Sequence, residues 1–263
     1  FKDNLKLNKL KPKNISIHTQ DANLFLLNQL NNKKKPANFC GYFDYIDIDP
    51  FGTPNPFIPA STARICRNGI LAITATDTAA LTGTYPQVTK RKYWAQTQKN
   101  YMMHEIGLRI LIRKIQLQAL QFDKALTPIL AYHKDHYFRI YFRSSNGKEK
   151  CDVLLKQHQF LLFNPKTLDY EISKNNHKTD FQTSGPLWTG KLKDQKLINK
   201  MCKDNPFEEE TKFLQKIKTE NNTVGFYDHH IIAKKYKFDI IKKELLLKKL
   251  NASETNFSPT GFK

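Results

Sequence analysis

One stretch of the sequence decides the fold class: residues 43–52 read FDYIDIDPFG. Its first six residues predict a β-strand, which stops at the turn-forming Asp49-Pro50-Phe51-Gly52. A second strand is predicted at residues 70–75, ILAITA, whose apolar character is typical of a strand buried on both faces of a parallel sheet. Between the two strands, residues 56–66 predict a helix that Asn68-Gly69 are suited to close.

Elements on both sides extend this strand–helix–strand unit into an α/β fold. Upstream, residues 1–10 predict the tail of a helix, residues 14–18 a short strand and residues 24–30 an apolar helix. Downstream, residues 76–96 are rich in Thr and Lys and predict a loop, and loops of this length in a compact domain are usually functional. The alternation of strands and helices favours a doubly wound, Rossmann-like sheet.

A long helix and a hairpin follow. The helix is predicted at residues 101–121, where apolar side chains recur at helical spacing. Residues 128–132 and 137–143 predict two strands around a turn at Lys134-Asp135. The second of these strands alternates bulky apolar with basic side chains, so one of its faces is expected in the core and the other outside it.

The turn signal Ser144-Ser145-Asn146-Gly147 marks a predicted boundary between two domains, residues 1–146 and residues 147–263. The second domain is richer in Lys and is expected to be a smaller α+β domain. Near its end, two helices and a strand are predicted at residues 231–236, 240–250 and 252–257. This order of elements sketches a winged-helix-like unit.

The charge of the chain points to a polyanionic partner. The sequence holds 43 Lys and Arg against 24 Asp and Glu, a formal net charge of +19. Such an excess repels itself in a compact fold, and nucleic acid is the usual partner that relieves the repulsion. The 40% hydrophobic content is enough for a packed core and excludes wholesale disorder.

The cysteines and the apolar runs exclude several other classes. Four cysteines (Cys40, Cys66, Cys151 and Cys202) are widely scattered without a C-x-x-C pair, which fits neither a zinc site nor a secreted disulfide framework. No apolar run approaches the roughly 20 residues that a membrane-spanning helix needs. We therefore expect a cytoplasmic protein with free thiols, no membrane partner and no bound metal.

The tripeptide Asp49-Pro50-Phe51 suits one reaction in particular, the methylation of an exocyclic amine. The carboxyl edge of a parallel sheet is where ligands bind, and these residues follow a strand. An exocyclic nitrogen is a poor nucleophile until a carboxylate and a backbone carbonyl accept its hydrogens and turn its lone pair towards a methyl donor. A neighbouring aromatic ring can stack on an extruded base. A plain helix-capping turn is the alternative for this tetrapeptide taken alone.

Six segments of the chain, in the same order, resemble the tRNA guanine-26 N2-dimethyltransferase family. They read DIDPFGTPNPF (47–57), GILAITATDTA (69–79), HEIGLRIL (104–111), DHYFR (135–139), GPLW (185–188) and FSPTG (257–261). The resemblance implies a class I methyltransferase domain followed by a C-terminal tRNA-binding domain. It also implies S-adenosylmethionine as cofactor and the N2 amine of guanine 26 of tRNA as acceptor, methylated once and then again.

By this resemblance, Asp49 is the catalytic carboxylate, with Pro50 and Phe51 beside it. Asp21 and Ala22 match the family's segment next to the adenine of the cofactor. The loop Thr76-Asp77-Thr78 would border the guanine pocket, although a plain turn at the end of a strand accounts for it equally well.

Four basic residues are candidates for contacts with tRNA phosphates. Arg139 and Arg143 share one face of a predicted strand, and Lys234 and Lys235 lie on a predicted helix. Such contacts would be blind to sequence and sensitive to salt. A solvated sheet face and the ordinary wet side of a helix are equally consistent with them.

The chain departs from the family pattern in two places. None of its ten glycines forms the G-x-G of the cofactor-binding loop, so we expect the first strands and that loop to lie upstream of Phe1. Many family members carry zinc-binding Cys pairs in the second domain, but the matching stretch here has only Cys151, so no zinc is predicted. A monomer is expected.

Two other functions stay open at this point. A non-catalytic RNA-binding protein that kept the fold is favoured by the missing glycine-rich loop and disfavoured by the intact Asp49-Pro50-Phe51. An amino-methyltransferase that acts on another RNA or on DNA is disfavoured by the matches from Gly185 to Gly261.

Overall fold

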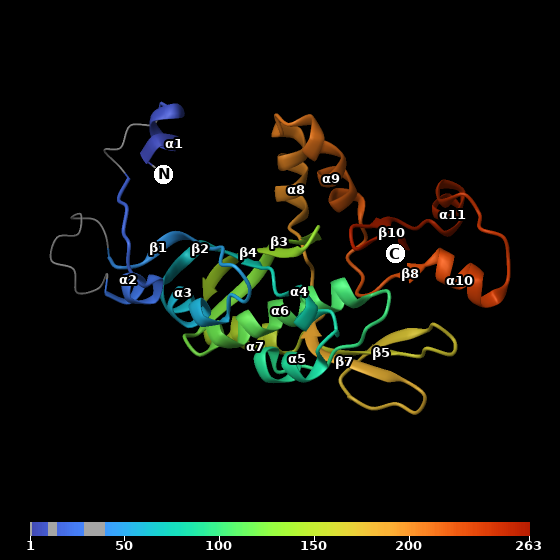
Figure 1. Ribbon diagram of the computed structural model, residues 1–263. Helices are drawn as coiled ribbons and strands as arrows, with labels where there is room; N and C mark the ends of the chain where they lie inside the picture. Colours follow the sequence, from blue (N-terminus) through green and yellow to red (C-terminus); the bar gives the residue numbers. More distant parts are fainter. Residues whose placement is uncertain (1, 10–14, 29–39) are drawn as a thin grey trace.

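The fold is built on a four-stranded central sheet, which the computed structural model shows with helices on both of its faces (Figure 1). The structure describes residues 2–9, 15–28 and 40–263. The sheet has the order β1-β2-β4-β3, with β1 (Phe43–Ile48), β2 (Ile65–Ala75), β3 (Lys124–Lys134) and β4 (Tyr137–Asn146). β1 and β2 run parallel, and β4 runs antiparallel to both of its neighbours. The predicted α/β fold and the predicted hairpin are confirmed.

The connection from β1 to β2 passes through a short 3-10 helix, η2 (Asn55–Phe57), and α3 (Ile58–Arg64). The predicted helix was too long, because β2 already begins at Ile65, which pairs with Phe43 of β1. The predicted cap at Asn68-Gly69 was wrong, since both residues lie inside β2.

A distant lysine satisfies the end of α3 instead. The ammonium of Lys124 donates to the carbonyl oxygens of Thr62, Ala63 and Ile65 at 2.9, 2.8 and 2.7 Å. The last carbonyls of a helix have no partner within the helix, and a cation there also complements the helix dipole. Lys124 is buried, so this bond pattern fastens the first residue of β3 to the crossover helix.

Two further expectations were wrong. Residues 15–18 form no strand, and residue 14 lies outside the described residues. The predicted loop at 76–96 contains two short helices, α4 (Thr78–Leu81) and α5 (Pro86–Tyr93). The fixed φ of Pro86 favours the first turn of α5, and the buried Tyr93 fixes its end, against a polar composition that favoured a loop.

The elements predicted upstream agree better with the structure. α1 covers Lys2–Leu7, and α2 covers Ala22–Asn28 of the helix that was expected at residues 24–30. The last two residues of that expected helix lie outside the described residues.

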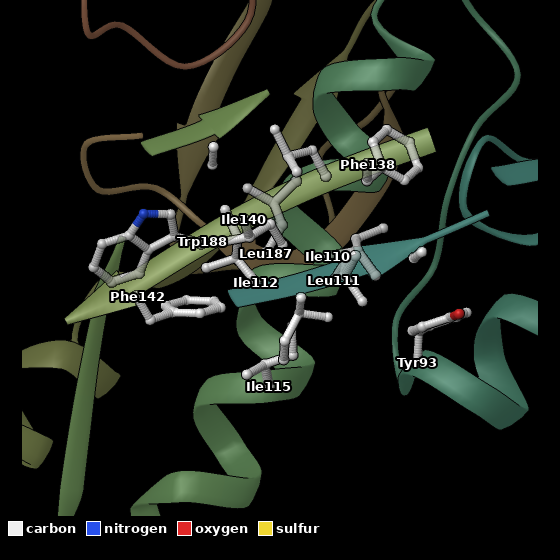
Figure 2. Packing of buried hydrophobic residues seen from close by; sticks show 14 of the residues in the cluster. Tyr93, Ile110, Leu111, Ile112, Ile115, Phe138, Ile140, Phe142, Leu187 and Trp188 are labelled. Atoms are coloured by element: carbon white, nitrogen blue, oxygen red, sulfur yellow. The ribbon is translucent and has the colours of Figure 1, made fainter. Parts of the chain in front are cut away.

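The long predicted helix is confirmed as α6 (Met103–Leu120), which covers one face of the central sheet. Figure 2 shows Ile110, Leu111 and Ile115 of α6 beside side chains of the sheet and of β7. The labelled members of this packing from β4 and β7 are Phe138, Ile140, Phe142, Leu187 and Trp188. Because alternate residues of β4 point to this face, the alternation seen in the sequence corresponds to a real division between core and outer face.

Gly107 allows α4 to pack closely against α6. A Cβ atom at position 107 would lie 2.9 Å from the carbonyl oxygen of Leu81 in α4. Ala normally favours a helix over Gly by about 1 kcal/mol, whereas forcing extra volume into a packed contact costs about 1–3 kcal/mol. We expect Gly107→Ala to lower the midpoint of urea denaturation. A higher midpoint would mean that the backbone of Leu81 moves aside without strain.

The second half of the chain contains two small antiparallel sheets and a helical hairpin. The first sheet has the order β6-β5-β7 and the second β8-β10-β9. The strands are β5 (His158–Phe163), β6 (Tyr170–Ser173), β7 (Gln182–Trp188), β8 (Tyr227–Asp228), β9 (Glu254–Thr255) and β10 (Ser258–Phe262). The helices are α7 (Lys148–Leu155), α8 (Gln195–Asp204), α9 (Glu208–Thr219), α10 (His229–Tyr236) and α11 (Lys243–Leu250). The two helices predicted near the end are confirmed as α10 and α11, whereas only Glu254–Thr255 of the strand predicted at residues 252–257 is a strand and β10 was not predicted.

α8 and α9 stand out from the sheet as a hairpin (Figure 1). Its base packs on the sheet face opposite α6, where Ile198 and Ile217 contact Leu130 and the partly buried Tyr132 and Tyr141. The sheet is therefore covered on one face by α6 and on part of the other by the hairpin.

A buried ion cluster joins α6 to the end of the described chain. The carboxylate of Glu105 accepts from the guanidinium of Arg109 at 2.8 Å and from the ammonium of Lys263 at 3.0 Å. It also accepts from the backbone N–H of Gly225 at 3.1 Å. Burial acts to raise the pKa of Glu105, but the charges of Lys263 and Arg109 outweigh it and hold that pKa below its usual range.

The same helix is tied to β7, since Arg109 donates to the carbonyl oxygens of Trp188 and Gly190 at 2.9 Å each. One hydrophobic cluster also includes buried residues from before and after residue 146. The boundary at 146/147 therefore stays a prediction.

Candidate active site

The segment Asp49-Pro50-Phe51 is held at both ends at the carboxyl edge of β1. On one side, Ile48 pairs with Ile73 of β2. On the other, the N–H of Gly52 donates to Oγ1 of Thr76 at 2.6 Å, and the N–H of Thr76 donates back to the carbonyl of Gly52 at 3.0 Å. Gly52 has a φ of +86°, which a residue with a side chain rarely adopts. Asp49, Pro50 and Phe51 therefore lie between two residues, Ile48 and Gly52, that are both held by hydrogen bonds to the neighbouring segment.

The side chains of Asp49 and Phe51 are open to solvent, and Pro50 is half-buried. The relative exposure of Phe51 is 105%, the highest of the exposed large hydrophobic side chains among the described residues, and Asp49 is exposed as well. An aromatic ring gains nothing for folding when it stays in water. A ring displayed beside a free carboxylate is therefore suited to a ligand that stacks on it and donates hydrogen bonds.

The structure brings the predicted loop Thr76-Asp77-Thr78 to this segment. Thr76 holds Gly52, as described, and Asp77 precedes the first residue of α4. The hydroxyl of Tyr93 donates to Oδ2 of Asp77 at 2.6 Å and lies 3.0 Å from Oγ1 of Thr53. Tyr93 was not predicted as a site residue, because it lies in a Lys-rich stretch whose composition favours a loop.

Asp21 and Ala22 lie at the start of α2. Oδ1 of Asp21 accepts from the N–H of Leu24 at 2.9 Å and so caps the helix, while Oδ2 has no hydrogen-bond partner among the described residues. The side chain is exposed. A free carboxylate oxygen suits an amine donor such as the exocyclic nitrogen of adenine, so this position fits the cofactor that the resemblance implies. No hydrogen bond joins Asp21 to residues 49–53 within the described part of the chain.

The two arginines of β4 differ in their surroundings. Arg139 donates to both carboxylate oxygens of Asp47 at 2.7 and 2.6 Å and to Oγ1 of Thr74 at 2.7 Å. Burial acts to raise the pKa of Asp47, but its hydrogen bonds from Arg139 and Tyr45 lower it overall. Arg139 therefore clamps three strands together just below the edge of the sheet.

Arg143 is exposed and donates to the carbonyl of Asn68 at 3.3 Å. The guanidinium of Arg143 therefore has more N–H groups available to bind an anion than the guanidinium of Arg139 has.

Lys234 and Lys235 are exposed on α10, the latter with its ammonium 5.8 Å from the ring centre of Tyr236. Residues 234–249 hold seven Lys against two acidic residues, so this end of the molecule is strongly basic. The remaining lysines are Lys237, Lys242, Lys243, Lys248 and Lys249.

No helix within residues 2–9, 15–28 and 40–263 is long and apolar enough to cross a membrane. The same residues contain no group of three or more His, Cys, Asp or Glu side chains that could hold a metal ion.

Comparison with known proteins gives a consistent answer. A family model described as N2,N2-dimethylguanosine tRNA methyltransferase matches residues 1–263. A tRNA (guanine(26)-N(2)/guanine(27)-N(2))-dimethyltransferase from Aquifex aeolicus is 38% identical, over 100% of this chain and 69% of its own length. A tRNA (guanine(26)-N(2))-dimethyltransferase from Pyrococcus horikoshii is 36% identical, over 95% of this chain and 66% of its own.

A solved structure agrees with the sequences. Trm1 from Pyrococcus horikoshii, in complex with S-adenosyl-L-methionine, superposes with a TM-score of 0.85 at 34% sequence identity. The match covers 94% of this chain and 67% of that one, so the chain spans about two thirds of the length of these relatives. Together with the exposed segment at the edge of β1, these likenesses settle the family. The chain belongs to the N2,N2-dimethylguanosine tRNA methyltransferase family.

Proposed function

We propose that the protein transfers methyl groups from S-adenosylmethionine to the N2 amine of guanine 26 in tRNA, first one and then a second. The observation that carries this proposal is the segment Asp49-Pro50-Phe51, which is fixed at both ends, exposed, and placed at the carboxyl edge of the sheet. Membership of the family supports it, as does the net charge of +19.

In this mechanism the chain orients a weak nucleophile. The Asp49 carboxylate and the Pro50 carbonyl accept the two hydrogens of the N2 amine, which turns its lone pair out of the plane of the base. Phe51 stacks on the extruded guanine. S-adenosylmethionine, when bound, would supply the methyl group as an electrophile and leave as the neutral thioether S-adenosylhomocysteine. Asp49 then takes the proton that the amine releases, and the remaining N–H of the monomethylated amine binds for the second transfer.

Other residues have supporting roles in this proposal. Oδ2 of Asp21, next to Ala22, accepts from the exocyclic amine of the adenine of the cofactor. Thr76, Asp77 and Thr78 border the guanine, because Thr76 is bonded directly to Gly52 at the end of the catalytic segment.

The tRNA would be docked by the part of the chain after residue 146, acting as a monomer. Lys234 and Lys235 would contact phosphates together with Arg143 of the sheet face, whereas Arg139 would act through its clamp on Asp47. A tRNA substrate and four free cysteines support a site of action in the cytoplasm.

A methyl-transfer assay tests the proposal. The 263-residue chain and the full-length gene product are incubated in parallel with labelled S-adenosylmethionine and unmodified tRNA. A matched tRNA that carries adenine at position 26 serves as the control. We expect label only in the guanine-26 tRNA, as a mixture of mono- and dimethylguanosine. If the full-length protein binds the guanine-26 tRNA but transfers no label to it, the proposal is wrong and an RNA-binding role is favoured.

The exposed ring of Phe51 gives a prediction of its own. Stacking of a base on an aromatic side chain is worth about 1–3 kcal/mol, so we expect Phe51→Ala to lower kcat/KM for tRNA by about 5- to 150-fold. The melting temperature is expected to stay unchanged because the ring is fully exposed. Phe122→Ala is the control, since that ring is also exposed but lies in the turn between α6 and β3, outside the proposed site and the tRNA-docking part of the chain. Equal kcat/KM values for the two variants would remove the stacking role of Phe51.

A further inference from the structure

Tyr93 combines complete burial with an unusual set of polar contacts. Its relative exposure is 0%, and it ends α5 at the margin of the main hydrophobic cluster. Figure 2 shows its hydroxyl pointing away from the packed side chains of α6 and β4. On that side the hydroxyl contacts two loops, through Thr53 and Asp77.

The chemistry of the partners fixes the direction of these hydrogen bonds. An ionised carboxylate can only accept, so the Tyr93 hydroxyl donates its hydrogen to Asp77, and its oxygen accepts from the Thr53 hydroxyl. The Thr53 oxygen in turn accepts from the N–H of Asn55 at 3.4 Å. Burial, followed by the charge of Asp77, raises the pKa of Tyr93, so the hydroxyl stays protonated and able to donate.

This chain of hydrogen bonds crosses between the segments that carry the proposed site. Thr53 follows Gly52, which closes the catalytic segment, and Asp77 follows Thr76, to which Gly52 is bonded. A second link runs from Nδ2 of Asn55 to the carbonyl of Lys92, the residue before Tyr93, at 3.2 Å. α5 therefore holds the loop after β1 and the loop after β2 at one fixed separation.

We propose that Tyr93 is a positioning residue, which holds the segment Asp49-Pro50-Phe51 and the guanine-bordering loop in register without touching the substrate. The role in catalysis rests on the proposed methyl transfer, whereas the brace itself rests on the hydrogen bonds alone. Because a misplacement of about 1 Å can cost a hundredfold in rate, a brace of this kind acts on kcat rather than on binding.

The test compares Tyr93→Phe with Tyr101→Phe in the full-length protein. Tyr101 is a matched control, since its hydroxyl is buried and has no hydrogen-bond partner among the described residues. Hydrogen–deuterium exchange is measured over residues 49–55 and 76–78. Loss of the brace is expected to speed exchange there about three- to tenfold in Tyr93→Phe and not in Tyr101→Phe.

Methyl transfer is measured on the same variants. We expect Tyr93→Phe to lower kcat about ten- to a hundredfold with little change in the KM for tRNA, and Tyr101→Phe to match the wild type. Thr53→Val removes the hydrogen bond between the Thr53 and Tyr93 hydroxyls and leaves Tyr93 itself unchanged. We expect this variant also to show faster exchange and a lower kcat, so it tests the brace even if Tyr93→Phe folds poorly.

The outcomes separate the two proposals. Unchanged exchange in both Tyr93→Phe and Thr53→Val would overturn the brace, whatever the activity. Faster exchange with an unchanged kcat would keep a structural brace and overturn the positioning role. An inactive wild type would defeat the proposed function, and the exchange data would still decide whether Tyr93 braces the two loops.

Discussion

Replacing Asp49 by Asn is expected to lower kcat for methyl transfer by about two to four orders of magnitude, the usual worth of a positioned acid–base group. The amide keeps the size of the side chain and one acceptor oxygen, but it cannot take the proton that the amine releases. The melting temperature is expected to stay within about 1 °C of the wild type, because surface changes without partners are nearly neutral. No hydrogen bond or ion pair of the described residues uses the Asp49 side chain.

Asp44→Asn is the matched control for this prediction. Asp44 is an exposed carboxylate on the same strand, β1, near its other end, where it accepts from the thiol of Cys66. We expect its kcat to equal that of the wild type. If the Asp49→Asn variant kept full activity, Asp49 would not be the catalytic carboxylate, and the search would move to Asp77 on the neighbouring loop.

Glu105→Ala is expected to destabilise the protein by about 3–5 kcal/mol, because it leaves the buried guanidinium of Arg109 without a carboxylate and removes one of the two carboxylates that Lys263 contacts. Arg109 and Lys263 are each about 1% exposed, so water cannot replace the lost partner. For a chain of this size the loss corresponds to a fall in the melting temperature of roughly 6–20 °C. Thermal denaturation followed by circular dichroism measures it.

Glu210→Ala serves as the control for Glu105→Ala. In its ion pair with Lys134, the side chains of Lys134 and Glu210 are 38% and 47% exposed, and exposed pairs are worth about 0–1 kcal/mol. A fall of less than about 1 kcal/mol for Glu105→Ala would mean that Glu220, which lies 3.2 Å from Lys263, takes over the cluster.

The pH dependence of the wild type gives a second check. Glu105 has a lowered pKa in the folded state, so its contribution to stability is present above the ordinary pKa of Glu and is lost as the pH falls through the folded value. We therefore expect the difference in stability between the wild type and Glu105→Ala to shrink on the acid side.

The sequence predicted those helices and strands whose formation depends mainly on the residues within the element itself. β1 begins and ends at the residues predicted for it, and α6 differs from its prediction by two residues at one end and one at the other. The cap of α3 could not be predicted, because its donor Lys124 lies about 60 residues away along the chain. The two helices within residues 76–96 were missed, because the burial of Tyr93 and its hydrogen bond to Asp77 outweigh a polar composition.

The same distinction between local and distant contacts applies to the candidate site. Asp49-Pro50-Phe51 could be predicted because the end of a strand and the chemistry of the residues coincide in one short stretch. Tyr93 could not, since its role depends on bonds to Thr53 and Asp77, which are 40 and 16 residues distant. For Arg139, the sequence showed a free basic side chain, and only the pairing of β4 with β2 reveals that Asp47 and Thr74 already bind it.

The ion cluster around Glu105 also limits how early during synthesis this part of the protein can reach its final structure. Lys263 is made 158 residues after Glu105, which at about 5–20 residues per second is a delay of roughly 8–30 s. During that interval the start of α6 carries a carboxylate whose second cation has not left the ribosome. The cluster can therefore be completed only after those 158 further residues have been added to the chain.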